Sequence, residues 1–106
     1  MTDLNRFSLP AAGPAGGGWC VYLVLCGGNR LYCGITNQPE ARFAAHAAGK
    51  GAKFTRMHKP LAMRLVYVDL PRSDAAKLEP QIKKLKAAQK QELWALLAEY
   101  LVIESD

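Results

Sequence analysis

The sequence predicts an α+β fold in which helices flank a three-stranded antiparallel sheet. The first observation is an apolar run at 19–26, a turn at 27–29 and a second strand-like run at 30–35, which is the pattern of a β-hairpin. The second is a further strand-like run at 62–70, set between segments whose apolar residues recur at helical spacing. With 106 residues, half of them hydrophobic, the chain is long enough for one domain with one modest core.

Composition divides the chain into three parts. Residues 1–18 end in a stretch of Pro, Gly and Ala that cannot build a core, so we expect a flexible tail. Residues 19–90 are expected to form the folded domain. Residues 91–106 are expected to form a C-terminal amphipathic helix that packs on this domain or extends it.

The same composition indicates a cytoplasmic protein. No apolar run approaches the roughly 20 residues of a membrane span, and the N-terminus lacks the pattern of a secretory signal. The cysteines number three, and an odd count argues against a closed disulfide framework and for a reducing compartment. We therefore expect no membrane association, and we favour a monomer.

The two strands of the predicted hairpin each carry a tyrosine, Tyr22 and Tyr32. The run at 19–26 is apolar throughout, as expected of a strand covered on both faces. If the turn is a three-residue loop, Tyr22 lies opposite Gly34, and Tyr32 is its diagonal neighbour on the same face. Gly34 then leaves room beside a large ring. A two-residue loop would put the tyrosines on opposite faces, so this inference depends on the register.

The first helix is expected to begin after a cap at Thr36 or Asn37, with a proline in its first turn, and to stop at Gly49. Within it Arg42 and His46 are four residues apart, so they lie one above the other on a single face.

Two more helices are expected after the third strand. Ser73 is expected to cap the second, whose apolar stripe runs from Ala75 to Leu85. The last helix is expected to carry an apolar stripe from Leu93 to Leu101.

Positive charge gathers in one part of the chain. The net charge is +5, and the segment from 41 to 68 holds six Lys or Arg residues and no acid. Because these residues cluster at and after the first helix, around a basic loop at 49–53 that we expect to be mobile, a polyanion partner is favoured over an ordinary solvated basic face. The side chains expected to contact nucleic acid are Lys50, Lys53, Arg56 and Lys59.

Hairpin and first helix together would bring Tyr22, Tyr32, Arg42 and His46 near one surface. Arg42 can clamp a phosphate bidentately and stabilise the charge that develops during its cleavage. His46 titrates near neutrality and can move a proton or bond a phosphate oxygen. The set therefore suits the binding and cutting of a phosphodiester. The alternatives are strand tyrosines with rings in the core and hydroxyls at its rim, and a histidine on the helix surface.

Glu79 is a candidate metal ligand. It comes one position after the buried stripe of the second helix, where a carboxylate could face a cleft and hold Mg²⁺. The alternative is an exposed ion pair with Lys83, four residues on. Pro80 deletes a helical hydrogen bond and disfavours helical geometry at Glu79, so we expect the helix to kink there or to start later.

These residues resemble a known family. Cys20-Val21-Tyr22, a short hairpin and then Tyr32-Cys33-Gly34 resemble the signature of the GIY-YIG nucleases, with Arg42 and His46 at the family's downstream spacing. The segment from Gly49 to Arg56 resembles the small bacterial single-domain members, which are similar to the nuclease domain of the excinuclease subunit that makes incisions in DNA repair. The likeness runs from about residue 19 to residue 90, so the resemblance makes that part a GIY-YIG-like domain with the sheet and helices described above.

The resemblance also implies roles for the site residues. Tyr22 would orient or deprotonate the attacking water, with Tyr32 supporting the same site. Arg42 would hold the scissile phosphate, and His46 would accept a proton or bind the phosphate. Glu79 would hold one divalent ion, Mg²⁺ or Mn²⁺, which stabilises the leaving oxygen.

Three functions from different classes follow. The leading one is a metal-dependent DNA endonuclease that acts in repair or on branched DNA, with RNA as a second substrate left open. The second is a non-catalytic nucleic-acid-binding module that keeps the GIY-YIG fold. Two departures from the family pattern favour it. Pro80 directly follows the candidate metal ligand, and only Gln89 or Gln91 could stand in for the late polar amide that many family nucleases have. The third is a protein-interaction module that uses the apolar, acidic last helix.

Overall fold

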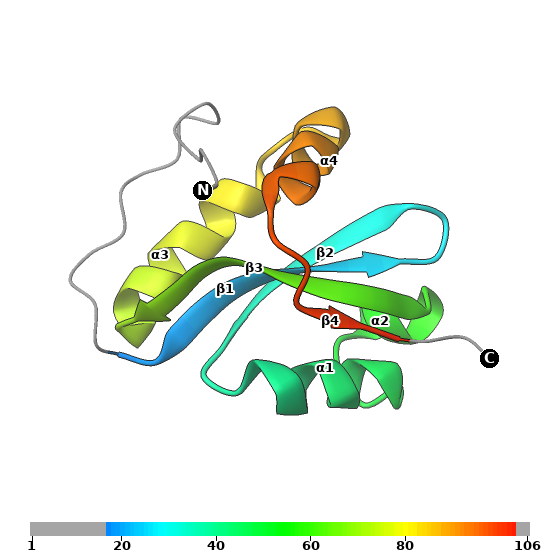
Figure 1. Ribbon diagram of the computed structural model, residues 1–106, viewed down its shortest axis with the longest axis horizontal. Coiled ribbons are helices and arrows are strands. Elements are labelled where there is room, and N and C mark those ends of the chain that lie inside the picture. The colour runs from blue at the N-terminus through cyan, green and yellow to red at the C-terminus, as the bar shows by residue number, and fades with distance from the viewer. Residues whose placement is uncertain (1–16, 104–106) are drawn as a thin grey trace.

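The computed structural model describes residues 17–103, so all but the last two residues of the predicted tail lie outside the described part. A single antiparallel sheet with the strand order β2-β1-β3-β4 forms the centre of the molecule (Figure 1). The strands are β1 (Trp19–Cys26), β2 (Arg30–Thr36), β3 (Pro60–Leu70) and β4 (Leu101–Val102). The helices are α1 (Pro39–Ala47), α2 (Lys53–Met57), α3 (Arg72–Lys83) and α4 (Ala87–Leu96).

The hairpin has the register that a three-residue loop predicts. Cys26 pairs with Arg30, and Tyr22 pairs with Gly34. The loop places Asn29 at φ 60°, in the left-handed region that Asn tolerates better than most residues. A side chain at Gly34 would put its Cβ 2.4 Å from the hydroxyl oxygen of Tyr22, so the phenol occupies the space that the glycine leaves. The expectation about register and about Gly34 is therefore confirmed.

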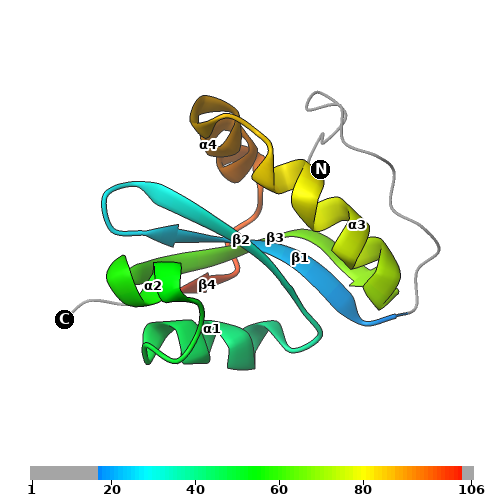
Figure 2. The same cartoon turned by 180° about the vertical axis from the view of Figure 1, so that it is seen from behind.

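β1 lies between β2 and β3 and is covered on both faces. One face carries Val21 and Leu23, which pack with buried residues of α3 and α4. The other carries Tyr22 and Val24, which pack with Phe43 of α1. Figures 1 and 2 show the same division, with α1 and α2 on one side of the sheet and α3 and α4 on the other. The continuous apolar run of β1 reflects this double cover.

The sheet has four strands, so the expectation of three was one strand short. The predicted last helix was also too long, because α4 ends at Leu96 and the chain then returns to the sheet. There Leu101 pairs with Met63. Arg64 of β3 helps to end the helix, since its Nη1 donates to the carbonyl oxygen of Trp94 at 2.8 Å. A two-residue strand leaves no periodic pattern in a sequence, and its place is set by tertiary contact.

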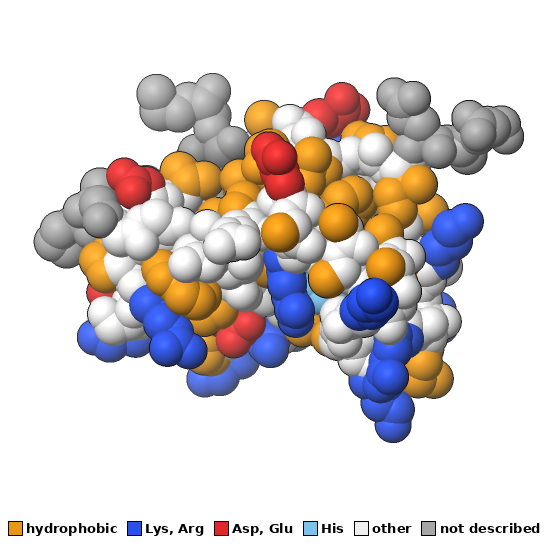
Figure 3. Space-filling view, turned by 90° about the horizontal axis from the view of Figure 1, so that it is seen from below, with side chains coloured by type: hydrophobic (Ala, Val, Ile, Leu, Met, Phe, Trp, Pro, Cys, Tyr) orange, Lys and Arg blue, Asp and Glu red, His pale blue; other side chains and the backbone are white. Residues whose placement is uncertain are grey.

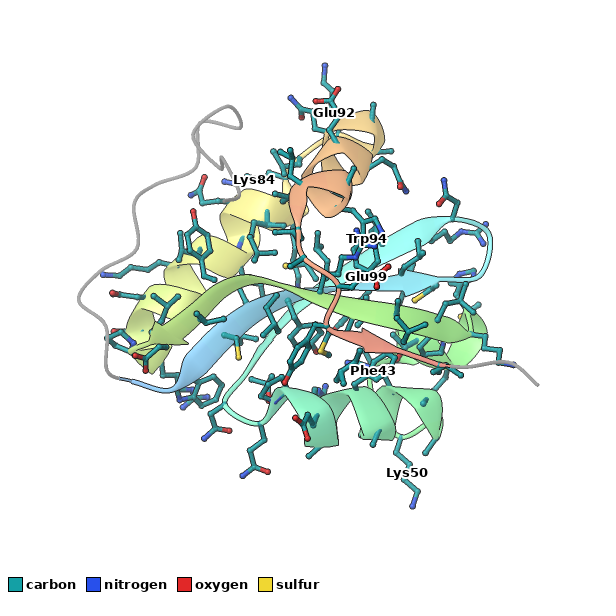
Figure 4. The ribbon with its side chains drawn as sticks, in the orientation of Figure 1. Phe43, Lys50, Lys84, Glu92, Trp94 and Glu99 are labelled. Atoms are coloured by element: carbon teal, nitrogen blue, oxygen red, sulfur yellow. The ribbon has the colours of Figure 1, made fainter. Side chains whose placement is uncertain are left out.

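The apolar face of α4 is already used inside the molecule. Leu93, Trp94 and Leu97 are buried, and Figure 4 shows Trp94 between α4 and the sheet. The guanidinium of Arg64 lies 4.4 Å from the centre of the Trp94 ring. The expected boundary between residues 90 and 91 therefore falls inside a helix that belongs to the core, and this helix offers its apolar stripe to the sheet and not to a partner.

α3 begins earlier than expected and runs through its proline. Its N-cap is Pro71 and not Ser73, and the carbonyl oxygen of Pro71 accepts the amide protons of Asp74 and Ala75, both at 3.1 Å. Pro80 lies inside the helix, which continues to Lys83.

No helix among residues 17–103 is long and apolar enough to cross a membrane.

Candidate active site

Tyr22 and His46 form a buried hydrogen-bonded pair on the side of the sheet that α1 covers. The phenolic oxygen lies 2.8 Å from Nε2 of the imidazole. Only 1% of Tyr22 and none of His46 is exposed to solvent. The ring of Tyr32 lies beside both, with its centre 6.4 Å from that of Tyr22 and 5.4 Å from that of His46. The hairpin and α1 thus bring the three rings together as expected, but His46 is buried and not a surface residue.

The far side of His46 is held by α2 and the turn before it. Nδ1 of His46 lies 2.7 Å from the hydroxyl oxygen of Thr55, which in turn donates to the carbonyl oxygen of Ala52 at 2.9 Å. A Cβ at Gly51 would lie 2.2 Å from Nδ1, so the backbone of Gly51 lies directly against the ring. Phe54 stacks on Tyr32 with ring centres 5.8 Å apart. The site therefore has a wall made by residues 51–55.

The turn that ends α1 leads into residues 51–55 and so places them against His46. Gly49 has φ 76°, its amide donates to the carbonyl oxygen of His46, and the amide of Lys50 donates to that of Ala45 at 2.8 Å. These bonds define a Schellman motif, which confirms the expected stop at Gly49. At the other end of the helix the N-cap is Gln38, whose amide donates to the hydroxyl of Thr36.

Sequence reasoning missed Gly51, Phe54 and Thr55 as site residues, and it missed α2 altogether. The segment from 49 to 53 was expected to be a mobile loop, and only its charge and its family resemblance were used. The available signal was the order of residue types, in which a glycine is followed by an aromatic residue and a hydroxyl residue next to each other. Which ring such residues contact depends on the fold, since α2 is a five-residue helix held by its neighbours.

Burial and the charge of Arg42 set the protonation of the pair. Burial raises the pKa of Tyr22 to about 12, against a smaller lowering by the hydrogen bond and charge of Arg42. Burial first and the charge of the nearby Arg42 guanidinium second lower the pKa of His46 to about 4. Both rings are therefore neutral at pH 7. Arg42 is partly exposed and borders a shallow surface pocket, which is lined by Thr36, Asn37, Gln38, Ala41, Arg42 and Ala45.

Glu79 lies on the other side of the sheet from this group. It is on α3, where its Oε2 is 3.7 Å from Nζ of Lys83, as the alternative interpretation expected. Its charge also reaches Cys33, whose pKa is raised to about 12, by burial first and by Glu79 second. Cys33 follows Tyr32 on the edge strand β2. The carboxylate of Glu79 therefore lies near β2, on the face of the sheet opposite Tyr22 and His46. Within the described residues it is not bonded to the tyrosines, Arg42 or His46.

Within the part of the chain that the structure describes, Glu79 is the candidate carboxylate for a divalent ion. No three His, Cys, Asp or Glu side chains of the described residues are grouped as a metal site. Mg²⁺ commonly binds through one or two carboxylates and completes its shell with water and substrate phosphate oxygens. Glu79 is 24% exposed and can supply one such carboxylate once Lys83 moves away.

The four basic residues predicted to contact nucleic acid are exposed and close together in the chain. They lie at the end of α1, along α2 and just after it. Figure 4 shows Lys50 projecting away from the sheet, while Phe43 of the same region points into it. Figure 3 shows Lys and Arg side chains standing out from the face of the molecule seen from below. This basic segment consists of Lys50, Lys53, Arg56 and Lys59.

Comparison with known proteins places the chain in a family. Residues 18–92 match the family model of the GIY-YIG catalytic domain. A UPF0213 protein of Neisseria gonorrhoeae is 53% identical over 76 residues, which is 72% of this chain and 84% of that protein. A UPF0213 protein of Vibrio cholerae is 49% identical over 84 residues, covering 76% and 80%. No solved structure gives a significant match.

The match extends over most of the chain and includes the residues that build the site. The family model spans both tyrosines, Arg42, His46 and Glu79, and its end lies within α4. The α+β fold with an antiparallel sheet agrees with it. The chain therefore belongs to the GIY-YIG family, whose domain is a nuclease domain, and it has UPF0213 proteins of bacteria as relatives.

Proposed function

We propose that this protein is a metal-dependent DNA endonuclease that hydrolyses phosphodiester bonds in repair or on branched DNA. The observation that supports this most is the buried Tyr22–His46 pair set beside the partly exposed Arg42 and Tyr32. A neutral core histidine needs no arginine beside it, and the charge of Arg42 makes protonation of His46 harder still. The arrangement is explained more simply as an anion site with a neutral hydrogen-bonded pair behind it.

Arg42 and Tyr32 are the groups that meet the substrate first, because both are partly exposed. The guanidinium of Arg42 binds the scissile phosphate, since its planar fork matches two phosphate oxygens. The same charge stabilises the additional negative charge of the transition state. The surface pocket beside Arg42 gives the phosphate room to approach.

Tyr22 and His46 are buried, and they act as a neutral hydrogen-bonded pair. Burial raises the pKa of Tyr22 to about 12, and burial and Arg42 lower that of His46 to about 4, so transfer of the phenol proton to the imidazole is unfavourable and the resting pair is not ionised. Nδ1 and Nε2 of His46 both have partners inside the protein, so the ring does not bind phosphate directly. We assign Tyr22 the orientation of the attacking water and His46 the orientation of Tyr22.

Glu79 is the residue we assign to the divalent ion, Mg²⁺ or Mn²⁺. When bound, such an ion stabilises negative charge on the oxygen that leaves. The carboxylate of Glu79 would hold it from the back of β2, together with water and the substrate.

Cleavage of end-labelled duplex, flap and four-way-junction DNA with Mg²⁺ or Mn²⁺ tests the proposal. Arg42→Ala should lower the single-turnover rate by about 100-fold or more, as the loss of one group that stabilises transition-state charge does. Glu79→Gln should abolish the response to metal. Glu92→Gln, an exposed carboxylate on α4, and Lys77→Ala on α3 should cut like the wild type. Circular dichroism should show that all four variants are folded.

A wild type that is inert on every DNA form with both metals would contradict the proposal. The second candidate would then gain support, namely a nucleic-acid-binding module that lacks chemistry. The observation in its favour is the ion pair of Glu79 with Lys83, which neutralises the assigned metal ligand. That module should bind DNA with strong salt dependence and without any effect of metal.

A further inference from the structure

The hydrogen bonds around His46 form a chain whose direction can be worked out. Its links are the phenol of Tyr22, the two ring nitrogens of His46, the hydroxyl of Thr55 and the carbonyl of Ala52. Every link is between 2.7 and 2.9 Å, so each holds one proton. The carbonyl oxygen of Ala52 has no proton of its own, which fixes the direction from that end.

Thr55 has a single hydroxyl proton, and it lies toward Ala52. Two oxygens 2.9 Å apart repel each other unless a proton lies between them, and the carbonyl oxygen can only accept. Such a bond to the carbonyl three residues back is common for threonine in a helix. The hydroxyl oxygen therefore accepts at its other contact, and Nδ1 of His46 must carry the ring proton.

With the proton on Nδ1, Nε2 of the neutral ring has only a lone pair. The Tyr22 hydroxyl then donates to Nε2, so His46 uses neither lone pair of the phenolic oxygen, and one of these lone pairs accepts the hydrogen bond of Arg42. In the other tautomer Nε2–H would donate to the phenol and occupy one of those lone pairs, so the phenol would present its proton elsewhere. Only the first arrangement leaves the Tyr22 oxygen as an acceptor for a water proton while its own proton is held by His46.

We propose that Thr55 is a positioning residue of the active site, whose hydroxyl holds His46 in the Nδ1–H tautomer and thereby directs the proton of Tyr22. The catalytic consequence rests on the proposed nuclease function, but the tautomer does not. Gly51 contributes as well, because its backbone covers the ring edge that carries Nδ1. It thereby excludes water from the hydrogen bond between Nδ1 and the Thr55 hydroxyl. The stretch 50–59 thus holds the imidazole through Gly51 and Thr55 and also carries the charges expected to contact nucleic acid.

The tautomer is read directly by long-range ¹H–¹⁵N NMR of the full chain, because a protonated and an unprotonated ring nitrogen have well-separated ¹⁵N shifts. The chain has two histidines, and His58→Gln identifies the signals of His46. The expected result at pH 7 is a single neutral species with the proton on Nδ1. A proton on Nε2 in the wild type would overturn the proposal, whatever the protein does to DNA.

Two substitutions test the role of the hydroxyl. Thr55→Val keeps the shape and removes the acceptor, so His46 should lose its single tautomer. We expect kcat to fall about 10- to 100-fold, the range known for partners that orient a metal-bound histidine. Thr55→Ser keeps the hydroxyl and should restore both the spectrum and most of the rate. KM should stay near the wild-type value, because Thr55 is buried and touches no substrate.

Several outcomes would count against the role of Thr55. If Thr55→Val keeps the Nδ1–H spectrum, or changes it while kcat stays at the wild-type value, the hydroxyl is not a positioning group. If the valine variant fails to fold, the wild-type spectrum and the Thr55→Ser spectrum and rate still decide. If the wild type cuts no DNA, the nuclease proposal fails, while the NMR arm still tests the tautomer.

Discussion

His46 is a basic side chain that the fold keeps neutral. Both of its ring nitrogens are bonded within the protein, none of its surface is exposed, and Arg42 adds a positive charge nearby. Each of these features opposes a charge on the imidazole, and none of them exists in the unfolded chain. The protonation of one residue is therefore linked to folding itself.

This linkage predicts a loss of stability in mild acid. The pKa of His46 is about 4 in the folded protein and near 6.5 in the unfolded chain, so between these values only the unfolded chain binds the proton. The free energy of unfolding should fall as the pH drops from about 6.5 toward 4, by up to roughly 3 kcal/mol. Urea unfolding over this pH range measures it.

Two variants separate this effect from other titrations. His46→Gln should lack the decrease that the wild type shows above pH 4.5, whereas His58→Gln should keep it. An equal decrease in wild type and His46→Gln would show that other groups cause it.

The elements that could be predicted from the sequence are those with a local signal. The hairpin followed from a glycine-rich turn between two apolar runs, and α1 from a proline at its start and Gly49 at its end. These elements carry Tyr22 and His46, so their approach could be foreseen. α2 and β4 have five and two residues, and such short elements exist only through contacts with the rest of the fold. Thr55 was missed for the same reason.

α3 shows a conflict between a local rule and the fold. Pro80 has no amide proton, so the bond that would reach the carbonyl of Ala76 is lost, yet the helix continues for three more residues. Burial of Ala75, Leu78 and Ile82 on one side of the helix offsets this loss. The packing of the element thus overrides the preference of one residue.

Pro80→Ala should therefore stabilise the protein. It restores an amide donor at an exposed position and replaces the weakest helix former with the best one. We expect the free energy of unfolding to rise by about 1–3 kcal/mol, measured by urea unfolding and seen as a higher Tm. Gln81→Ala, a change at the next exposed position, should alter it by only a few tenths of a kcal/mol. A Pro80→Ala protein no more stable than the wild type would mean that α3 is shaped around its proline.

Across the whole molecule, basic side chains lie on both sides of the sheet. The basic segment lies beside the Tyr22–His46 pair, whereas Lys77 and Lys84 of the α3 region lie on the other side. Figure 4 shows Lys50 and Lys84 projecting from opposite sides of the molecule. A net charge of +5 alone would attract DNA to either side, so charge by itself does not locate the interface.

Salt dependence distinguishes the two sides. Each lysine that contacts a phosphate contributes about 0.9 to the slope of log K against log salt, because binding releases counterions. Lys50→Ala with Lys53→Ala should therefore lower the slope by about two and weaken binding most at low salt. Lys77→Ala with Lys84→Ala removes the same charge from the other side and should leave the slope unchanged. Fluorescence anisotropy of labelled DNA over a KCl series measures both pairs. Equal losses would show that DNA responds only to total charge, whereas a loss confined to the first pair would place the strand on the face where Arg42 and Tyr32 are exposed.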